Sequence, residues 1–203
     1  MSTVGAGPTA IATPVLVAGT AGGVGTTTVT ALLFAALAQR AEGAPLLFDH
    51  SAGELGLRLA EGDDVGQVDP ALALHDLGPH GGGAAVFRLA DPGAVLVLVA
   101  PATPAGCLAA DRVLTTVSQR HGNPGLRRVV VAGVGVFGRH RITSQLGPLR
   151  ERLGSGQVLV VGRDRALAAG GRIPLVRLDP QTVRAQQQLA AVLLERAGSP
   201  RRG

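Results

Sequence analysis

The sequence contains no tyrosine, no tryptophan and no lysine, and its 203 residues include only four phenylalanines and one cysteine. With so few aromatic rings, the chain offers few platforms on which bases can stack, which argues against single-strand nucleic-acid binding by stacking. The single cysteine, Cys107, excludes an intramolecular disulfide and a thiol cluster for a metal, and it favours the cytoplasm. The absence of lysine removes every reaction class that depends on that residue.

Long apolar runs and a leader sequence are also missing. No run of about 18 apolar residues occurs, so we expect no membrane span. Residues 1–13 lack the basic region and apolar core of a secretory signal, and we expect them to form a flexible tail. Residues 14–197 are long enough for a single well-cored domain, and residues 198–203 form a second, basic tail.

The positive charges are concentrated in the second half of the chain. Residues 1–100 carry 3 arginines and 9 acidic residues, whereas residues 101–203 carry 16 arginines and 5 acidic residues. An arginine-rich half is typical of a surface for DNA, acidic protein or anionic lipid, although a coding bias with solvated arginines gives the same pattern. The candidate contacts with DNA phosphates are Arg127, Arg128, Arg139, His140 and Arg141.

Apolar segments alternate with segments of helical periodicity along most of the chain. Strands are expected at 15–18, 45–49, 71–78, 94–100, 127–134 and 157–162, and helices from about 26, 54, 103 and 179 onward. This alternation predicts an α/β fold with a doubly wound, mainly parallel sheet flanked by helices. Asp49 and Asp76 end the second and third strands, at the edge where open α/β sheets bind ligands.

Residues 15–34, VLVAGTAGGVGTTTVTALLF, join an apolar strand to a helix through a glycine turn. The phosphate-loop pattern G-x-x-x-x-G-K-[ST] is matched at Gly25 and Thr27, but Thr20 replaces its first glycine and Thr26 its lysine. A glycine turn at a helix N-terminus favours an anion. The residues expected to bind a phosphate chain are Gly22, Gly23, Val24, Gly25, Thr26, Thr27 and Thr28.

Two other interpretations of this turn are open. Gly19, Gly23 and Gly25 also satisfy G-x-x-x-G-x-G, the form used by short-chain dehydrogenases, and Asp49 stands where a ribose-binding acid would. Those enzymes need a tyrosine and a lysine, so an active member is excluded while a bare cofactor binder is not. The second alternative is a strand-to-helix turn that needs glycine for close packing and binds nothing.

The rest of the chain favours the phosphate loop. The loop is followed in order by LLFDHSAGELGL at 46–57, ALALHDLGP at 71–79, ADPGAVLVLVAPATPAGCLAADRVL at 90–114 and VVGRDRALAAGGRIPLVRLDP at 160–180. This order resembles the deviant-Walker ATPases of the MinD/ParA superfamily over nearly all of residues 14–197. Within that superfamily, the pilus-localisation proteins of the TadZ/CpaE type are an attractive comparison, because degenerate phosphate loops occur among them. The resemblance implies a P-loop NTPase fold.

The resemblance also implies ATP and Mg²⁺ as cofactors. Thr27 matches the Mg²⁺ ligand of the family loop, Asp49 the first acid of its D-x-D element, and Asp76 its Walker B acid. Asp164 matches the acid of a later P-x-D element whose proline is Gly162 here. These matches predict that Mg²⁺, if nucleotide binds, is held through Thr27, Asp49 and Asp76.

Three charged positions of the family are replaced in this chain. Ala21 stands at the signature lysine, Thr26 at the phosphate-binding lysine, and Ser51 at the second acid of the D-x-D element. Because phosphoryl transfer depends on positioned charge, these losses predict weak or absent hydrolysis and leave Asp49 as the remaining catalytic candidate. An arginine from elsewhere can replace a lysine, and Arg58 and Arg163 are the nearest candidates along the sequence.

We therefore expect a degenerate MinD/ParA-like protein that regulates, scaffolds or positions another protein, as in cell division or pilus localisation, or that forms a homodimer. One alternative is an active switch ATPase that depends on Mg²⁺ and ATP. Another is a partition-type protein that binds DNA without sequence preference through its arginine-rich half. His50, His75 and His80 lie near the expected site, but no two stand at a close ligand spacing, so a histidine-bound metal is not favoured.

Overall fold

The computed structural model describes residues 12–40, 43–51, 54–59, 68–79, 81–135 and 145–198. In these ranges six strands form one sheet in the order β2-β3-β1-β4-β5-β6, and all neighbouring strands are parallel. The strands are β1 (Thr13–Gly19), β2 (Ala44–Asp49), β3 (Val68–Asp76), β4 (Val95–Pro101), β5 (Val129–Val134) and β6 (Val158–Val161). The predicted α/β class with a parallel sheet is confirmed.

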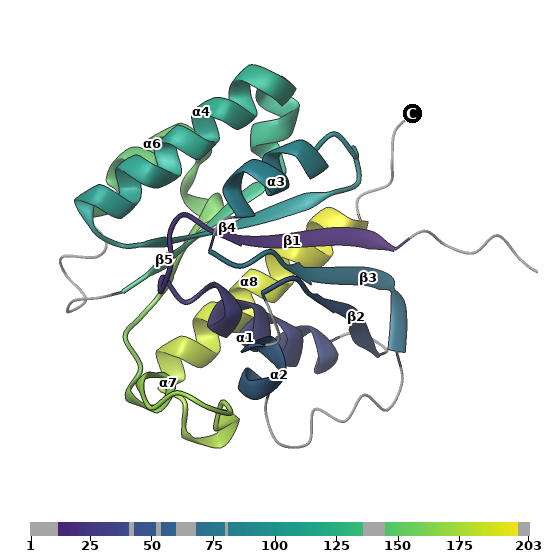
Figure 1. The fold of residues 1–203 in the computed structure, drawn as a ribbon, viewed down its shortest axis with the longest axis vertical. Helices are drawn as coiled ribbons and strands as arrows, with labels where there is room; N and C mark the ends of the chain where they lie inside the picture. The colour runs from purple at the N-terminus through teal and green to yellow at the C-terminus, as the bar shows by residue number, and fades with distance from the viewer. Residues whose placement is uncertain are drawn as a thin grey trace, which may run out of the picture.

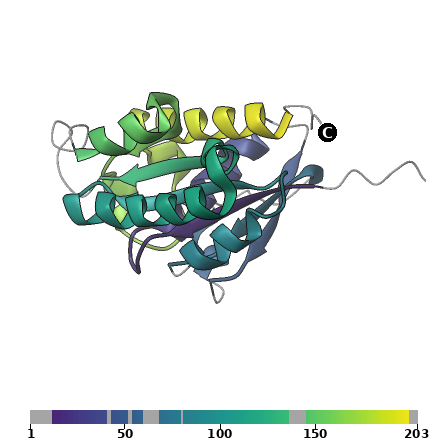
Figure 2. The same ribbon diagram turned by 90° about the horizontal axis from the view of Figure 1, so that it is seen from above.

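Helices cover both faces of the sheet, so the fold is doubly wound. Figure 1 shows α3 (Gly81–Arg88), α4 (Pro104–Arg127) and α6 (Gly147–Leu153) above the sheet, and α1 (Thr26–Ala38), α2 (Glu54–Arg58) and α8 (Pro180–Gly198) below it. Figure 2 looks down on the first face, where α4 lies between α3 and α6. The shorter elements are α7 (Arg165–Ala168) and the 3₁₀ turns η1 (Ser155–Gln157) and η2 (Leu175–Arg177).

The strands at the centre of the sheet are buried on both faces. In β1, Leu16 and Ala18 pack against α3 and α4, whereas Val15 and Val17 pack against α1. The same alternation along β4 explains why its sequence is an unbroken apolar run and not an alternating one.

Helix α1 is buried on almost all sides. Leu33 and Leu37 pack toward the strands, while Ala31 and Leu32 belong to a separate cluster with Leu55 of α2. Because α2 and α8 both contact α1, its outer side is covered as well. The helix therefore lies inside the fold, with its N-terminus at the loop after β1.

The helices that the sequence predicts from about residues 103 and 179 both begin at a side-chain cap. The Thr103 hydroxyl accepts a hydrogen bond from the Gly106 N–H at 3.1 Å, ahead of Pro104. The Asp179 carboxylate accepts one from the Gln181 N–H at 2.8 Å at the start of α8. The helical segment of α4 continues to Arg127 across a kink at Gly122, where φ is 60°.

The order of the strands indicates where a ligand-binding crevice is expected. β1 lies between β3 and β4, so the direction of winding reverses beside β1, and open sheets bind ligands at the carboxyl ends of strands at such a point. The usual dinucleotide order, 3-2-1-4-5-6, has β2 next to β1. Here β3 separates them, so Asp49 is one strand farther from the glycine turn than a ribose-binding acid would be. The topology therefore disfavours the dinucleotide interpretation.

At the opposite, N-terminal end of the sheet, long polar side chains bind backbone carbonyls. Arg128 donates to the carbonyl oxygens of Leu89 at 2.8 Å, Asp91 at 2.6 Å and Ala94 at 3.2 Å. The Gln157 amide donates to the carbonyls of Leu126 and Val129, and Arg196 also donates to Val129. These bonds join α3, β4, β5 and α8 at their connecting turns.

Within the described part of the chain, no helix combines the length and the apolar character needed to cross a membrane.

Candidate functional site

The glycine turn after β1 leads directly into α1, as the sequence predicts. Gly23 has φ 71° and Gly25 has φ 88°, in the left-handed region that favours glycine. Gly25 is the N-cap of α1 and offers no side chain to the first N–H groups of the helix. Those N–H groups have no partner within the helix, so this terminus favours an anionic ligand.

Backbone bonds fix the turn to the neighbouring strands. The N–H of Thr20 donates to the carbonyl of Val99 in β4 at 2.9 Å, and the N–H of Gly19 donates to the carbonyl of Gly78 after β3 at 3.0 Å. The start of the loop is therefore held at the switch point from both sides.

Thr26, at the position of the family's phosphate-binding lysine, brings a short hydroxyl in place of a charge. A Cβ atom on Gly19 would lie 2.2 Å from Thr26 Oγ1, so the threonine packs back against the strand and requires glycine there. Thr26 is 5% exposed, and its Oγ1 has no hydrogen-bond partner among the described residues. The position therefore supplies an unpaired buried hydroxyl and no cation.

Asp76, the Walker B match, is fully buried at the end of β3. Its Oδ1 accepts the N–H of Gly78 at 2.9 Å, whereas Oδ2 has no hydrogen-bond partner in the described part of the chain. Burial raises the pKa of Asp76, and the Asp49 charge adds to this increase, while the Gly78 N–H and the hydroxyls of Thr27 and Ser51 oppose it. A carboxylate in this state gains most from a nearby cation.

Asp49 lies beside Asp76 as its register partner in the next strand, but its carboxylate is already used. Oδ1 accepts the N–H and the hydroxyl of Ser51 at 2.7 and 2.6 Å, and Oδ2 accepts the N–H of Leu55 at 3.2 Å. Asp49 thus holds the turn into α2. Thr27, Asp49 and Asp76 therefore lie close together, and Asp76 is the less satisfied of the two acids.

A pocket of about 720 Å³ opens over the turn and the first residues of α1. This volume lies in the range of small-molecule and cofactor sites. Its floor includes the predicted residues Gly23, Gly25, Thr26, Thr27 and Thr28. Its walls come from α2, from Pro79 and from the segment Gly170–Arg172 that precedes the last helix. Gly22 and Val24 belong to the same turn, and Val24 packs into the core beneath it.

The walls contain two arginines. Arg58, one of the two candidates from the sequence, lines the pocket, and so does Arg172, which the sequence analysis missed. Arg163, the other candidate, is exposed and is not part of the lining. The run GGRIP at 170–174 places two glycines before Arg172, which indicates a turn at this position. Because this run is far from the glycine turn in sequence, the pattern does not show that Arg172 lines the same pocket.

Asp164 has a structural role. It is 6% exposed, and its carboxylate accepts the N–H of Ala166 at the start of α7 and the N–H of Asp179 before α8, both at 2.8 Å. These two bonds fix both ends of the segment that carries Arg172. The match to the family's P-x-D acid therefore coincides with a capping function.

The histidines near the site form a stack. His50 Nε2 lies 3.2 Å from His75 Nδ1, and His75 stacks on Phe48 with ring centroids 4.6 Å apart. Burial, helped by Arg88 and His50, lowers the pKa of His75 to about 4. Among the described residues no three His, Cys, Asp or Glu side chains are grouped to hold a metal, and His80 lies outside those residues.

The candidate DNA contacts divide into three groups. Arg139, His140 and Arg141 lie outside the described residues. Arg128 is engaged by the carbonyls at the N-terminal end of the sheet, and burial lowers its pKa. Arg127 is exposed beside it. Of these residues, Arg128 has the clearest structural role, because it fixes connecting turns.

A scan against protein-family models finds no match for this chain, and a search of curated proteins finds no similar sequence.

Proposed function

We propose that this protein is a degenerate MinD/ParA-like factor that binds a magnesium nucleotide at the turn after β1 and regulates, scaffolds or positions another protein in the cytoplasm, with weak or absent hydrolysis. The observation that carries the proposal is the pocket of about 720 Å³ whose floor is the glycine turn and the N-terminus of α1. A phosphate chain is the ligand that such a terminus favours.

The oxygen atoms near the floor fit Mg²⁺. Thr27 and Asp76 lie close enough for the threonine hydroxyl to lower the pKa of the carboxyl, and Asp76 Oδ2 is buried without a hydrogen-bond partner in the described residues. Mg²⁺ prefers oxygen ligands and is commonly held by one or two carboxylates together with phosphates and water. When bound, Mg²⁺ would neutralise phosphate charge and satisfy Asp76, while Asp49 supports the site from its place in the turn before α2.

Fast hydrolysis has less support. Thr26 brings no charge to the floor, Ser51 replaces the second acid, and the Asp49 carboxylate is occupied by Ser51 and Leu55. Phosphoryl transfer requires groups that neutralise charge and orient the attacking water. The floor therefore favours holding a nucleotide over cleaving it.

An active switch ATPase is the second candidate, and the arginines of the pocket wall favour it. Arg58 and Arg172 bring positive charge to the same cavity as the phosphate-binding turn. An arginine supplied from outside a phosphate loop can stabilise the charge of phosphoryl transfer.

Two measurements on the full chain separate these candidates. Titration with ATP, with and without Mg²⁺, should show binding that depends on Mg²⁺. Phosphate release at saturating ATP should be as slow for the native chain as for Asp76→Ala. Release that depends on Mg²⁺ and is abolished by Asp76→Ala would establish the switch ATPase, and failure to bind ATP would overturn both candidates.

A further inference from the structure

The charged side chains that line the pocket are Glu54, Arg58 and Arg172. They belong to two segments that lie far apart in sequence and face the same cavity. The floor brings no cation, because Thr26 packs its hydroxyl against Gly19 and Ala21 replaces the family's signature lysine. Among the described residues that line this pocket, positive charge for a bound phosphate chain is therefore supplied by the walls.

Arg58 joins these two walls. Its Nη1 donates to the carbonyl oxygen of Gly171 at 3.2 Å and to that of Leu167 at 3.5 Å. Its own carbonyl accepts the N–H of Ile173 at 3.2 Å. Arg58 of α2 is thus hydrogen-bonded to residues 167 and 171 through its side chain and to residue 173 through its backbone. The Arg58 guanidinium is committed to holding this segment in place.

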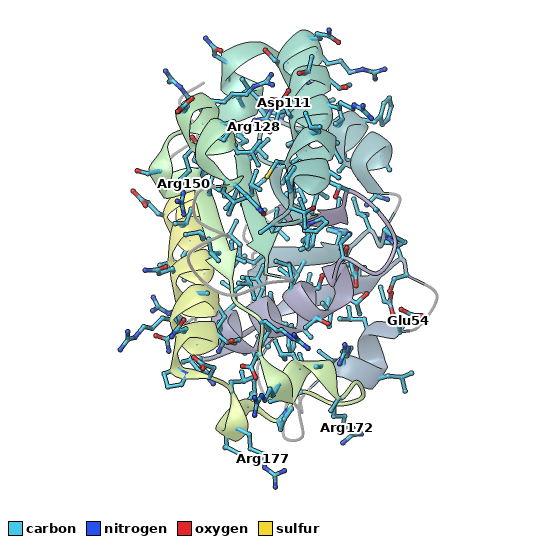
Figure 3. The ribbon with its side chains drawn as sticks, turned by 90° about the vertical axis from the view of Figure 1, so that its left-hand side faces the viewer. Glu54, Asp111, Arg128, Arg150, Arg172 and Arg177 are labelled. Carbon is cyan, nitrogen blue, oxygen red and sulfur yellow. The ribbon has the colours of Figure 1, made fainter. Side chains whose placement is uncertain are left out.

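Arg172 extends from a turn that only glycine readily adopts. Gly170 has φ 76° and Gly171 has φ 63°, and a Cβ atom on either would have open space around it, so conformation and not crowding selects glycine. Arg172 itself is exposed and lines the pocket. Figure 3 looks onto this end of the molecule and shows Arg172 at its lower margin near α2, with Arg177 farther out and directed away from the fold.

We propose that Arg172 is the cation that contacts the phosphate chain of the bound nucleotide, replacing the missing lysines, and that Arg58 is the residue that positions it. This inference rests on the proposed function. The planar guanidinium of arginine suits bidentate contact with phosphate oxygens. The helix terminus would approach the phosphates from the floor and Arg172 from the rim. Asp76 Oδ2, which is fully buried beside Thr27 of the floor and has no hydrogen-bond partner in the described residues, independently indicates a ligand at this end of the sheet.

The contact predicts a preference among ligands. A charge at the rim interacts more strongly with a longer and more anionic phosphate chain, so the affinity should rise from AMP to ADP to ATP. Removing the charge should reduce ATP affinity more than AMP affinity. A general loosening of the pocket would instead weaken all three ligands by the same factor.

The test is a calorimetric titration of the full chain with AMP, ADP and ATP in the presence of Mg²⁺. Arg172→Ala should lower ATP affinity about tenfold, the effect of losing one hydrogen bond to a charged group, and should reduce the ATP to AMP ratio. Arg172→Lys should restore part of both. The matched control is Arg177→Ala, an exposed arginine of the same connection that does not line the pocket, and it should bind like the native chain.

The positioning role of Arg58 has its own readout. Arg58→Ala should also lower ATP affinity, but in the Arg172→Ala background it should add little, because the two residues act as a unit. Additive losses would contradict that role.

The inference is overturned if the native chain binds ATP and Arg172→Ala matches Arg177→Ala. If the native chain binds no nucleotide, the proposed function fails first and this inference falls with it. Thermal unfolding of Arg172→Ala checks that the variant is folded, and its midpoint should equal that of the Arg177→Ala control.

Discussion

At the N-terminal end of the sheet, Arg128 donates to three carbonyl oxygens of the turn before β4, and Gln157 and Arg196 both donate to Val129. At the C-terminal end, Asp76 Oδ2 and Thr26 Oγ1 are buried with no hydrogen-bond partner in the described part of the chain. Leaving a buried polar group unpaired costs about 1–3 kcal/mol. We call the N-terminal end of the sheet the closed end, because these hydrogen bonds pair its polar groups and stabilise the fold. We call the C-terminal end the open end, because it retains polar groups that a ligand can satisfy.

The largest expected effect is at the closed end. Arg128→Ala should lower the free energy of unfolding by about 2–3 kcal/mol, because the carbonyls of Leu89, Asp91 and Ala94 lose a charged donor. Urea unfolding measures the change. The control is Arg127→Ala at the exposed neighbouring residue, which should stay within about 0.5 kcal/mol of the native value. Equal effects of the two substitutions would contradict the structural role of Arg128.

The next effect on stability distinguishes Asp49 from Asp76, the two acids of the open end. Asp49→Ala should destabilise the protein by about 1–2 kcal/mol, because Ser51 and the N–H of Leu55 lose their acceptor at the start of α2. Asp49→Asn keeps one acceptor oxygen and should cost less. Urea unfolding of both variants checks the order. An unchanged stability of Asp49→Ala would show that this carboxylate is not structural.

Substitution of Asp76 should stabilise the protein, in contrast to substitution of Asp49. Asp76→Asn should raise the stability of the ligand-free protein at neutral pH by about 1 kcal/mol, or about 2–4 °C in Tm, because it removes a buried charge and keeps an acceptor for Gly78. The same substitution should remove the Mg²⁺ dependence of ATP binding. Calorimetric melting and ATP titration measure the two changes.

The stability gained by Asp76→Asn should decrease as the pH is lowered. The folded-state pKa of Asp76 is raised, so ionisation weakens the native protein as the pH rises through that value. Below the ordinary carboxyl pKa the side chain is neutral in both states, and the advantage of Asp76→Asn should disappear. A destabilising effect of the substitution at neutral pH would contradict this account.

The smallest effect concerns the histidine stack beside the open end. Burial lowers the folded-state pKa of His75 from 6.5 to about 4, so the unfolded chain binds a proton first and stability should fall as the pH decreases through this interval. One proton changes the free energy by at most about 1.4 kcal/mol per pH unit, and partial exposure makes the slope smaller. His75→Phe should flatten the dependence of Tm on pH, and His50→Phe, which removes only the last of the three causes of the lowered pKa of His75, should change this dependence less.

The sequence predicts the central strands and the local turns better than the wall of the pocket. β1 and β4 were predictable because unbroken apolar runs are typical of central parallel strands. The Thr103 cap and the glycine turn have local signatures of residue type and spacing. These features depend on residues that are close together in the sequence, so a local sequence pattern is enough to predict them.

The pocket wall depends on contacts between residues about a hundred positions apart, which no local pattern encodes. Arg58 bonds to Leu167 and Gly171, and these bonds hold the segment with Arg172 at the pocket that also contains the turn after β1. The burial of α1 on its outer side has the same origin, since α2 and α8 supply the cover. The sequence identified Asp49 and Asp76 together, but only the structure shows that both Asp49 oxygens accept hydrogen bonds while Asp76 Oδ2 has no partner among the described residues.

Amide hydrogen exchange with and without Mg²⁺ and ATP tests the central claim most directly, because it reports where a ligand binds. The account predicts that the ligand slows exchange in the turn at residues 22–28 and in the wall at residues 170–173, while amides around Arg128 at the closed end are unchanged. Binding that leaves exchange at residues 22–28 unaltered, or no response anywhere to Mg²⁺ and ATP, would contradict it.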